Sequence, residues 1–407
     1  MDSRFIVANN GARHGYAVPY SLAKLGLLER FYTDICGNVG CGALLQQGKV
    51  LPFVGDRLQR LAGRQVPTEI RPLTYTFALP NIQWLTRAAF SSQDGSHQFY
   101  LSCLKSLELG HAMVQKGFGN ATHLYSMLGE FSPLIVAAEQ RGIKVISDVY
   151  ILLSTEQILA EERSRFPTWE PAVPNYDVVR QELLPENVLL TRTHFFICPS
   201  EAVQDDLVYN FGIKPTQIAV VPYGVDPTFL ELKPNSIPRR ILFAGTANLR
   251  KGIHYLAMAA EQLSQSGYKY EFRVAGNVDE AVAEKPICKY LTFLGRIPRD
   301  QIHQEFCTAD VFVLPSLAEG SAGVIYEALG AGIPVVTTKA SGSVVRDGIE
   351  GYIVPERNPE ALARAIVEIV ENRVKREKMA IAARERAQNF TWEKYGDRLT
   401  TALKTLS

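Results

Sequence analysis

The sequence has few of the features that identify large protein classes at once. It lacks an excess of one charge, because Lys and Arg number 43 against 42 Asp and Glu, and net charge therefore provides no general attraction to nucleic acid or to an anionic membrane. No apolar run approaches the roughly 20 residues of a membrane span, and Phe5–Ala8 is too short for the apolar core of a signal peptide. These absences predict a cytoplasmic protein with no nucleic-acid partner.

Clustered cysteines are also missing. No Cys-x-x-Cys pair and no Cys/His cluster has the spacing of a zinc or redox site. No Asp-x-Asp pair stands at a predicted strand end to hold a metal ion, so we expect reduced thiols, no metal and no cofactor. The six cysteines are scattered over the chain: Cys36, Cys41, Cys103, Cys198, Cys288 and Cys307.

The chain has 407 residues, of which 46% are hydrophobic, and this is enough for two or three globular domains. It opens with a predicted strand at Phe5–Ala8, a turn at 9–11 and a helical stretch. The apolar residues of that stretch recur at steps of three and four: Val18, Leu22, Leu25 and Leu28. Further strands of this part are predicted at His123–Ser126, Lys144–Ser147 and Phe195–Cys198.

Proline and glycine are dense between residues 222 and 239, which indicates a linker. Alternating strands and helices follow it and predict a parallel sheet covered on both faces. We therefore predict an α/β fold of two doubly wound, Rossmann-like domains, 1–225 and 226–390, facing a cleft that binds the ligand, with a helix at about 391–407 packing back on the first domain. The strands predicted after the linker are Arg240–Ala244, Glu271–Ala275, Leu291–Leu294, Asp310–Leu314, Pro334–Thr338 and Gly351–Val354.

Two cations follow the first strand of the second domain. The strand ends at Gly245, and Arg250 and Lys251 stand just before the next helix. Cations beside the positive start of a helix favour an anion, above all a diphosphate. The alternative is that both are solvated loop charges. No Gly-x-Gly-x-x-Gly follows any predicted strand, so a nicotinamide enzyme is poorly supported.

Two glutamates, Glu319 and Glu327, are separated by eight positions. On one continuous helix they would lie about 12 Å apart along the axis and about 80° apart around it, too far to share a small ligand. Gly320 and Gly323 instead favour a loop that turns into a helix near 321–324. Glu319 then lies at the mouth of the strand and Glu327 one turn into the helix, both within reach of an extended ligand. The alternative is two glutamates with purely structural roles.

These residues resemble the retaining, nucleotide-sugar-dependent glycosyltransferases of the GT-B type, the group often called family 4 or glycosyl transferases group 1. The resemblance covers roughly residues 195–390, and the first 190 residues match only in outline. Six elements occur in the order of that family: Val220–Asp226, Arg250–Gly252, Phe293–Pro298, Asp310–Ser316, Glu319–Glu327 and Gly330–Val336.

The resemblance implies a nucleotide-sugar site in the second domain and an acceptor site in the first. Lys251, with Arg250, would hold the donor diphosphate, Glu327 the ribose and Glu319 the transferred sugar, while the loop at 296–297 would line the base. Glu319, Lys251 and His14 are the catalytic candidates. The implied donor-binding set is Gly11, Gly245, Arg250, Lys251, Arg296, Ile297, Glu319, Gly320, Ser321, Ala322, Gly323, Val324 and Glu327.

The sequence departs from the family at three places. Thr246 stands where an arginine is common, which removes one phosphate-binding cation, and Ser321 stands where an aromatic residue is common. A histidine frequent near Asp148 is absent, and this leaves the catalytic contact of the first domain unassigned. His123 and Asp148 are expected to end or follow strands at a suitable depth. The remaining histidines, including His254, are expected to be ordinary surface or packing residues.

The implied reaction is transfer of a sugar, with retention, from a UDP-, GDP- or ADP-linked donor to a hydroxyl of a glycan, lipid-linked or small-molecule acceptor. The alternatives are a non-catalytic GT-B scaffold or partner subunit, or an epimerase or phosphorylase on the same fold. Basic and large apolar residues alternate from Lys49 to Arg71. This segment either rests on an anionic membrane as a peripheral contact or packs its apolar residues on the first sheet.

Overall fold

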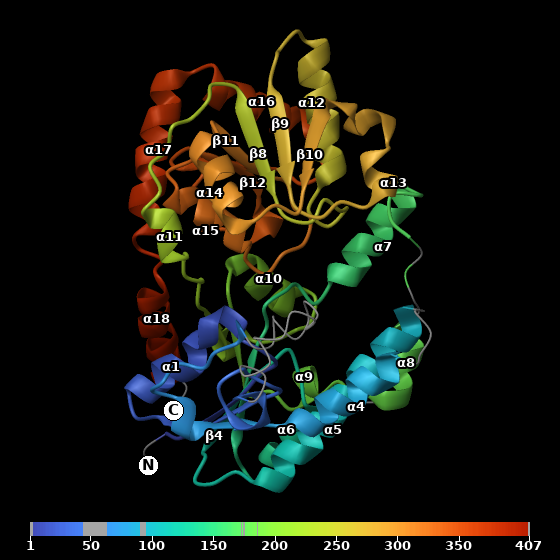
Figure 1. The fold of residues 1–407 in the computed structure, drawn as a ribbon, viewed down its shortest axis with the longest axis vertical. Coiled ribbons are helices and arrows are strands. Elements are labelled where there is room, and N and C mark those ends of the chain that lie inside the picture. Colours follow the sequence, from blue (N-terminus) through green and yellow to red (C-terminus); the bar gives the residue numbers. More distant parts are fainter. Residues whose placement is uncertain are drawn as a thin grey trace.

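Two parallel β-sheets organise the chain, one above the other in the view of Figure 1. The structure is a computed structural model and describes residues 3–43, 63–89, 95–171, 173, 176–184 and 186–405. The seven-stranded sheet has the order β3-β2-β1-β4-β5-β6-β7 and the six-stranded sheet the order β10-β9-β8-β11-β12-β13. The strand order reverses between β1 and β4 and between β8 and β11, and such switch points are where doubly wound sheets bind ligands. The predicted fold of two doubly wound domains is confirmed.

The N-terminal half of the chain forms the seven-stranded sheet. Its strands are β1 (Phe5–Ala8), β2 (Leu28–Thr33), β3 (Thr74–Thr76), β4 (His123–Met127), β5 (Lys144–Asp148), β6 (Phe195–Cys198) and β7 (Ile218–Val220). Its helices are α1 (Ala17–Lys24), α4 (Ala78–Ala89), α5 (Gly95–Lys116), α6 (Ser132–Glu139), α7 (Thr155–Arg165), α8 (Tyr176–Leu183), α9 (Val188–Thr191) and α10 (Glu201–Tyr209), with short 3-10 turns η1 (Arg13–Tyr16), η2 (Gly40–Ala43), η4 (Arg71–Leu73) and η5 (Pro215–Gln217).

The first predicted helix is too long. Helix α1 ends at Lys24, because Gly26 takes a positive φ of 68° that turns the chain, and Leu28 opens strand β2. Leu25, expected on the buried face, is 49% exposed. Strands β2, β3 and β7 were not predicted: β2 has polar and apolar residues in no strict alternation, and β3 and β7 are edge strands of three residues each.

The C-terminal half forms the six-stranded sheet, and all six predicted strands are confirmed to within one residue at each end. Continuous apolar stretches such as Val311–Leu314 are buried on both faces, as parallel strands require. The strands are β8 (Arg240–Ala244), β9 (Glu271–Ala275), β10 (Leu291–Gly295), β11 (Val311–Leu314), β12 (Val335–Thr338) and β13 (Gly351–Val354). The helices are α11 (Pro227–Leu230), α12 (Ile253–Gln265), α13 (Glu280–Ala283), α14 (Arg299–Thr308), α15 (Gly323–Gly330), α16 (Pro359–Val370), α17 (Arg373–Ala387) and α18 (Trp392–Lys404), with 3-10 turns η6 (Pro286–Tyr290) and η7 (Lys339–Ser341).

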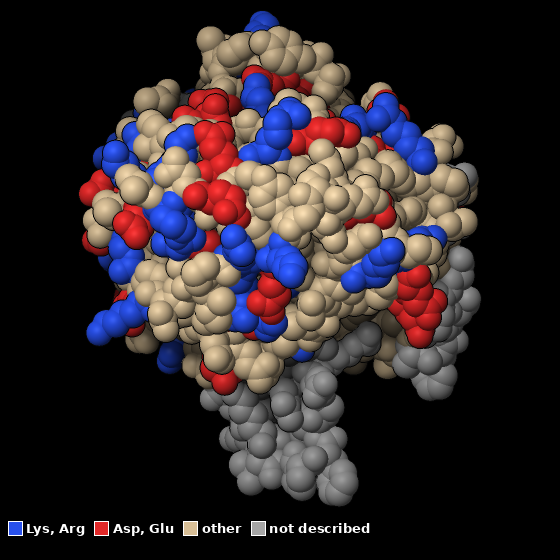
Figure 2. Space-filling view, turned by 90° about the horizontal axis from the view of Figure 1, so that it is seen from above, with Lys and Arg blue, Asp and Glu red and all other residues tan. Residues whose placement is uncertain are grey.

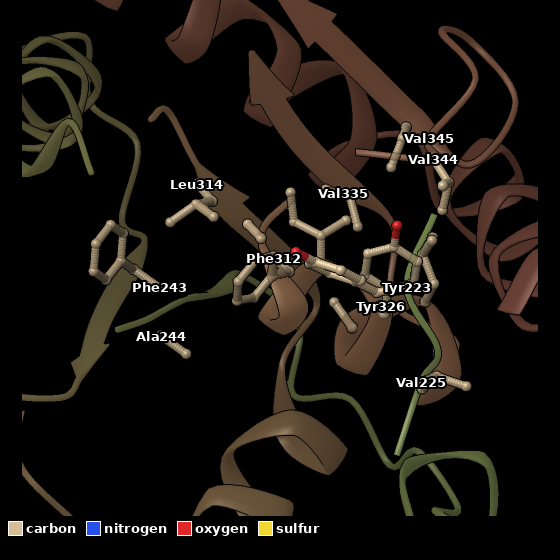
Figure 3. Close-up of a cluster of buried hydrophobic side chains, with 14 of the residues drawn as sticks. Tyr223, Val225, Phe243, Ala244, Phe312, Leu314, Tyr326, Val335, Val344 and Val345 are labelled. Atoms are coloured by element: carbon tan, nitrogen blue, oxygen red, sulfur yellow. The ribbon is translucent and has the colours of Figure 1, made fainter. Parts of the chain in front are cut away.

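Helix α15 is fixed by the apolar core under the carboxyl edge of this sheet. Tyr326 of α15 is buried in one cluster with Phe312 of β11 and Val335 of β12 (Figure 3). Tyr223 and Val225, from the segment that joins the two halves, belong to the same cluster. The core therefore holds the start of α15 close to the place where the two halves meet.

The chain crosses between the two halves at neighbouring places. The Val225 N–H donates to the Phe390 carbonyl at 2.6 Å, so the outgoing segment and the returning segment lie together. Helix α18 then packs beside α1 (Figure 1), where a Cβ built on Gly396 would lie 2.5 Å from the Ser21 hydroxyl. Helix α7 of the N-terminal half extends in the opposite direction, up to the C-terminal half.

Charges of both signs are interspersed over the face shown in Figure 2, as the near-neutral composition predicts. Among the described residues, no helix is both long enough and apolar enough to cross a bilayer. Within the basic segment Lys49–Arg71, positions 49–62 lie outside the described residues. Arg64 is described and pairs with Asp34 at 3.2 Å.

Candidate active site

Both predicted phosphate-binding cations contact the first glutamate of the pair. The Lys251 Nζ lies 2.7 Å from one carboxylate oxygen of Glu319, and an Arg250 guanidinium nitrogen lies 2.6 Å from the other. Arg250 also donates to the Ala318 carbonyl at 3.0 Å. All three side chains are largely buried. The structure thus brings together residues that are 68 positions apart in the chain.

The loop before α12 holds the two cations in place. The Asn248 side chain accepts from the Lys251 backbone N–H at 3.0 Å, and the Lys251 side chain passes over Gly245. Gly252 has a φ of 71°, and a Cβ there would lie 2.0 Å from the Pro315 carbonyl oxygen. Only glycine fits at that point. The loop therefore presents Lys251 at the carboxyl edge of β8, as predicted.

The loop that follows Glu319 lies directly against the N-terminal half. A Cβ built on Gly320 would lie 1.7 Å from the Tyr150 carbonyl oxygen, so position 320 admits only glycine. The Ser200 hydroxyl donates to the Gly320 carbonyl at 2.5 Å. Ser321, where the family commonly has an aromatic residue, donates to the Gly342 carbonyl at 2.7 Å and so fixes the loop from within.

Helix α15 begins at Gly323, close to the predicted start. Its N-cap residue, Ala322, provides no side-chain cap. The Ala322 N–H donates to the Ser341 carbonyl. The N–H groups of the next residues, Gly323 and Val324, lie in the first turn of the helix, at the positive end of the helix dipole. This end of the helix is suited to bind an anion.

Glu327, the second glutamate, lines a cavity of about 840 Å³ between the two halves. Gly323, Asp226, His14 and Trp392 contribute to the same wall. Burial raises the pKa of Glu327 to about 7, with the Arg299 charge opposing this shift and the Asp226 charge adding to it. Glu327 therefore changes its charge near neutral pH. Lys251, Arg250 and Glu319 do not line this cavity, so the predicted site has two parts joined by the loop 320–322.

Asp226 and Arg299 were not predicted as site residues. They form an ion pair, and both act electrostatically on Glu327. Asp226 also caps α11 by accepting from the Thr228 N–H at 3.0 Å. Arg296, which the resemblance placed near the base, is exposed, and Ile297 packs on the core. No local sequence pattern connects Arg299 with Asp226 or Glu327.

The loop after β1 supplies Gly11 and His14. The Gly11 N–H donates to the Asp34 carboxylate at 2.9 Å. His14 has a φ of 49° and its ring packs against Tyr223, with 4.3 Å between the ring centroids. Burial, assisted by the charge of Arg13, lowers the pKa of His14 to about 4, so its imidazole is neutral at pH 7. His14 lies on the wall of the cavity that holds Glu327.

The expectation for His123 is wrong, and that for Asp148 is confirmed. His123 begins strand β4 instead of ending it, so it lies at the edge away from the cleft and stacks on Phe5. Asp148 ends β5 and is buried, and it accepts from the Tyr125 hydroxyl at 2.8 Å. Burial raises the pKa of Asp148 to about 6. Within the described ranges, no group of three or more His, Cys, Asp or Glu side chains is arranged to hold a metal ion.

The two parallel sheets and the cavity between them define an α/β protein with the two-domain GT-B fold. Two solved structures have the same fold over the whole chain. Sucrose-phosphate synthase from Thermosynechococcus elongatus is 17% identical, with a TM-score of 0.66 and 99% of both chains covered. Anabaena Alr3699/HepE, solved in complex with UDP and glucose, is 15% identical, with a TM-score of 0.61 and 99% of this chain and 100% of that chain covered.

Sequence comparison shows a similarity to one family of glycosyltransferases. Residues 238–372 match the family described as "Glycosyl transferases group 1". The C-terminal half of the chain is therefore similar to the glycosyltransferases of this group. The putative colanic acid biosynthesis glycosyltransferase WcaL of Salmonella typhimurium is 28% identical over 255 residues, which are 56% of this chain and 62% of that protein. The glycogen synthase of Mycobacterium tuberculosis is 24% identical over 313 residues, 71% of this chain and 72% of that protein.

Proposed function

We propose that the chain is a retaining glycosyltransferase, which moves a sugar from a nucleoside-diphosphate sugar to a hydroxyl of a glycan, lipid-linked or small-molecule acceptor. The observation that carries this proposal is the joint contact of Arg250 and Lys251 with Glu319. In a nucleotide sugar the transferred ring is bonded directly to the β-phosphate. A carboxylate for sugar hydroxyls beside two cations for phosphate matches that junction.

Each part of the proposed donor meets a group of suitable chemistry. Arg250, Lys251 and the start of α15 would bind the diphosphate through charge-assisted hydrogen bonds. Glu319 would accept from hydroxyls of the transferred sugar. Glu327, on the wall of the cavity, would accept from the ribose hydroxyls.

The proposed reaction depends mainly on electrostatic stabilisation. The bond between C1 of the sugar and the β-phosphate oxygen breaks, and its electron pair stays on the phosphate. The acceptor hydroxyl oxygen bonds to C1 on the same face, and its proton passes to a phosphate oxygen. Arg250, Lys251 and the helix start stabilise the charge that grows on the leaving phosphate, so no step of this scheme uses a metal ion. Retention rests on the resemblance to the family.

The relatives support a nucleotide-sugar donor and leave the acceptor open. Anabaena Alr3699/HepE was solved with UDP-glucose, and the D-inositol 3-phosphate glycosyltransferase of Paenarthrobacter aurescens is 28% identical over 220 residues. The names of the curated relatives mention colanic acid biosynthesis, glycogen and D-inositol 3-phosphate. A glycan, a lipid-linked glycan and a small molecule are therefore all acceptors to test.

A thermal-shift panel of UDP, GDP, ADP and their sugars tests the proposal. A ligand at a hundred times its Kd stabilises the folded protein by about 2.7 kcal/mol, which raises the melting temperature measurably. We expect one base to give the largest shift, and the matching nucleotide sugar to be hydrolysed or transferred by the wild-type protein. Binding without any turnover would favour the scaffold alternative. No shift with any nucleotide or nucleotide sugar would contradict the proposed function.

For the segment Lys49–Arg71, peripheral membrane contact and packing on the N-terminal sheet both stay open. Each Lys or Arg near anionic headgroups contributes about 1 kcal/mol, so membrane contact predicts sedimentation with anionic vesicles that salt reverses. A double variant, Arg57→Glu with Arg60→Glu, should then stay in the supernatant. Arg64 is left unchanged because it pairs with Asp34. If the wild type does not sediment at low salt, a soluble acceptor becomes the working assumption.

A further inference from the structure

Arg13 is a cation at the boundary between the two halves. It lies in turn η1, directly after the Gly11 loop, and its guanidinium carbon is 3.2 Å from the centroid of the Tyr150 ring. In the part of the chain that the structure describes, no carboxylate lies within ion-pair distance of Arg13. Stacking on an aromatic face orients a guanidinium and leaves its in-plane N–H donors available. Arg13 is thus held in place with its donors unused.

Tyr150 connects Arg13 to the donor loop. The Tyr150 carbonyl lies so close to Gly320 that no Cβ fits between them, and Gly320 directly follows Glu319. The Ser200 hydroxyl, which also belongs to the N-terminal half, donates to the Gly320 carbonyl at 2.5 Å. Arg13 therefore stands across the boundary from the loop that carries Glu319, and Tyr150 links them, with its ring under Arg13 and its backbone carbonyl against Gly320.

The net positive charge of the predicted phosphate-binding residues in the C-terminal half is smaller than the negative charge of a nucleoside diphosphate. Arg250 and Lys251 share one carboxylate, that of Glu319, so these three groups together carry one net positive charge. A nucleoside diphosphate brings at least two negative charges. Position 246, next to Gly245 at the end of β8, is an exposed threonine and adds none.

We propose that Arg13 is a further catalytic residue, which reaches from the N-terminal half to the β-phosphate of the donor. This inference rests on the proposed function. When the C1–O bond breaks and its electron pair moves to the β-phosphate oxygen, Arg13 stabilises the new charge from the N-terminal half, as Lys251 does from the C-terminal half. The diphosphate is then bound by both halves of the chain, so binding of the donor also holds the two halves together.

A purely structural role is the competing explanation. Glu130 and Asp148 lie close enough to Arg13 for its charge to lower the pKa of both carboxyl groups, although burial outweighs this effect. If Arg13 served only to compensate the charges of these two carboxyl groups, its loss would lower the stability of the fold and change the affinity for all ligands alike. The experiment must therefore distinguish an effect on the binding of the diphosphate from an effect on the binding of the rest of the nucleotide.

Calorimetry with matched nucleotides makes this separation. The probes are the tightest binder among UDP, GDP and ADP, the corresponding monophosphate, and inorganic pyrophosphate, all at low salt. Arg13→Gln should weaken the diphosphate and pyrophosphate about tenfold or more, because a hydrogen bond between charged groups is lost, and should leave the monophosphate unchanged. Arg13→Lys and Arg13→Gln both lose the planar guanidinium that stacks on Tyr150, but Arg13→Lys keeps the positive charge. Arg13→Lys should therefore bind the diphosphate more tightly than Arg13→Gln.

The control is Arg141→Gln. Arg141 lies over the Phe118 ring at 4.8 Å, on the surface of the N-terminal half, and has the same type of contact without a place near the donor loop. Its loss should change no nucleotide affinity. In assays of turnover, Arg13→Gln should lower kcat more than it raises KM, because the leaving phosphate carries more negative charge in the transition state than in the bound donor.

Each outcome decides between the explanations. Equal affinities of Arg13→Lys and Arg13→Gln for the diphosphate, or an equal loss for the monophosphate and the diphosphate, would overturn the role of Arg13. Unchanged diphosphate binding in Arg13→Gln, together with a loss in Lys251→Ala, would overturn it too and leave the proposed function standing. If the wild type binds none of the nucleotides or nucleotide sugars, the proposed function itself fails.

Discussion

Glu162 of α7 and His254 of α12 form a hydrogen bond of 2.8 Å, with both side chains fully buried, although they belong to opposite halves of the chain. Glu162 also accepts from the Tyr255 hydroxyl at 2.6 Å and from the Arg357 guanidinium at 2.7 Å. Burial alone would raise the pKa of Glu162, but these hydrogen bonds outweigh it and lower the pKa to about 2. One carboxylate thus joins α7 to three residues of the C-terminal half.

The first prediction follows from this contact. Glu162→Ala leaves the buried His254 and Tyr255 and the partly exposed Arg357 without this acceptor, and breaking such a buried pair costs about 3–5 kcal/mol. We expect a loss of about 3 kcal/mol or more in the free energy of unfolding, measured by denaturant titration. The matched control is Glu161→Ala, because Glu161 is 56% exposed and lies 3.5 Å from the same Arg357. The control should cost less than about 1 kcal/mol, and equal losses in the two variants would contradict the prediction.

The second prediction concerns pH and Glu327. The folded protein raises the pKa of this carboxyl group from 4.5 to about 7, so the folded state binds its proton more tightly than the unfolded state does. The contribution of Glu327 to stability is therefore lost as the pH rises from 4.5 to 7. Glu327→Gln carries no charge at any pH. Its melting temperature should exceed that of the wild type above pH 7, and the difference should shrink as the pH falls toward 4.5. A difference independent of pH would show that the buried charge is not the cause.

Much of the C-terminal half was predictable, because buried parallel strands are continuous apolar runs and each was found within one residue. The resemblance assigned Lys251 and Glu319 to one donor, but their direct contact was not predicted, since no local pattern joins residues 68 positions apart. His254, expected to be an ordinary surface or packing residue, is buried in a contact that spans 92 positions. The pair of Asp226 and Arg299 spans 73 positions. Long-range pairs of this kind depend on how the two halves meet, and no short stretch of sequence contains that information.

The third prediction separates the two glutamates of the candidate site. Glu319 competes with a diphosphate for Arg250 and Lys251, so Glu319→Gln should bind the free nucleotide at least as tightly as the wild type does, while its turnover falls. Glu327→Gln should weaken both the free nucleotide and the nucleotide sugar, because a carboxylate that accepts from ribose hydroxyls is replaced by an amide. Calorimetry with the nucleoside diphosphate measures both variants. An equal loss of nucleotide affinity in the two would show that the roles are wrongly divided.

The last prediction ranks the two cations. Among the described residues, the Lys251 ammonium donates to Glu319 alone, whereas Arg250 also donates to the Ala318 carbonyl and is therefore partly committed to the loop. The ammonium of Lys251 is the group that is freer to turn toward a phosphate. Lys251→Ala should lower the affinity for the nucleoside diphosphate about ten- to a hundredfold, since a hydrogen bond to a charged group contributes about 1.5–3 kcal/mol. Arg250→Ala should cost less affinity, unless Arg250 replaces the cation that is absent at Thr246.

Both variants remove one positive charge, so a general electrostatic effect would weaken binding equally in each. The surface variant Lys289→Ala, in which a lysine is lost beside Tyr290 on η6, measures that general effect. Calorimetry at two salt concentrations completes the comparison, because a direct contact resists screening better than a distant charge does. If Lys251→Ala binds the nucleotide as Lys289→Ala does, Lys251 does not hold the diphosphate, and the donor must be sought on the cavity wall around Glu327.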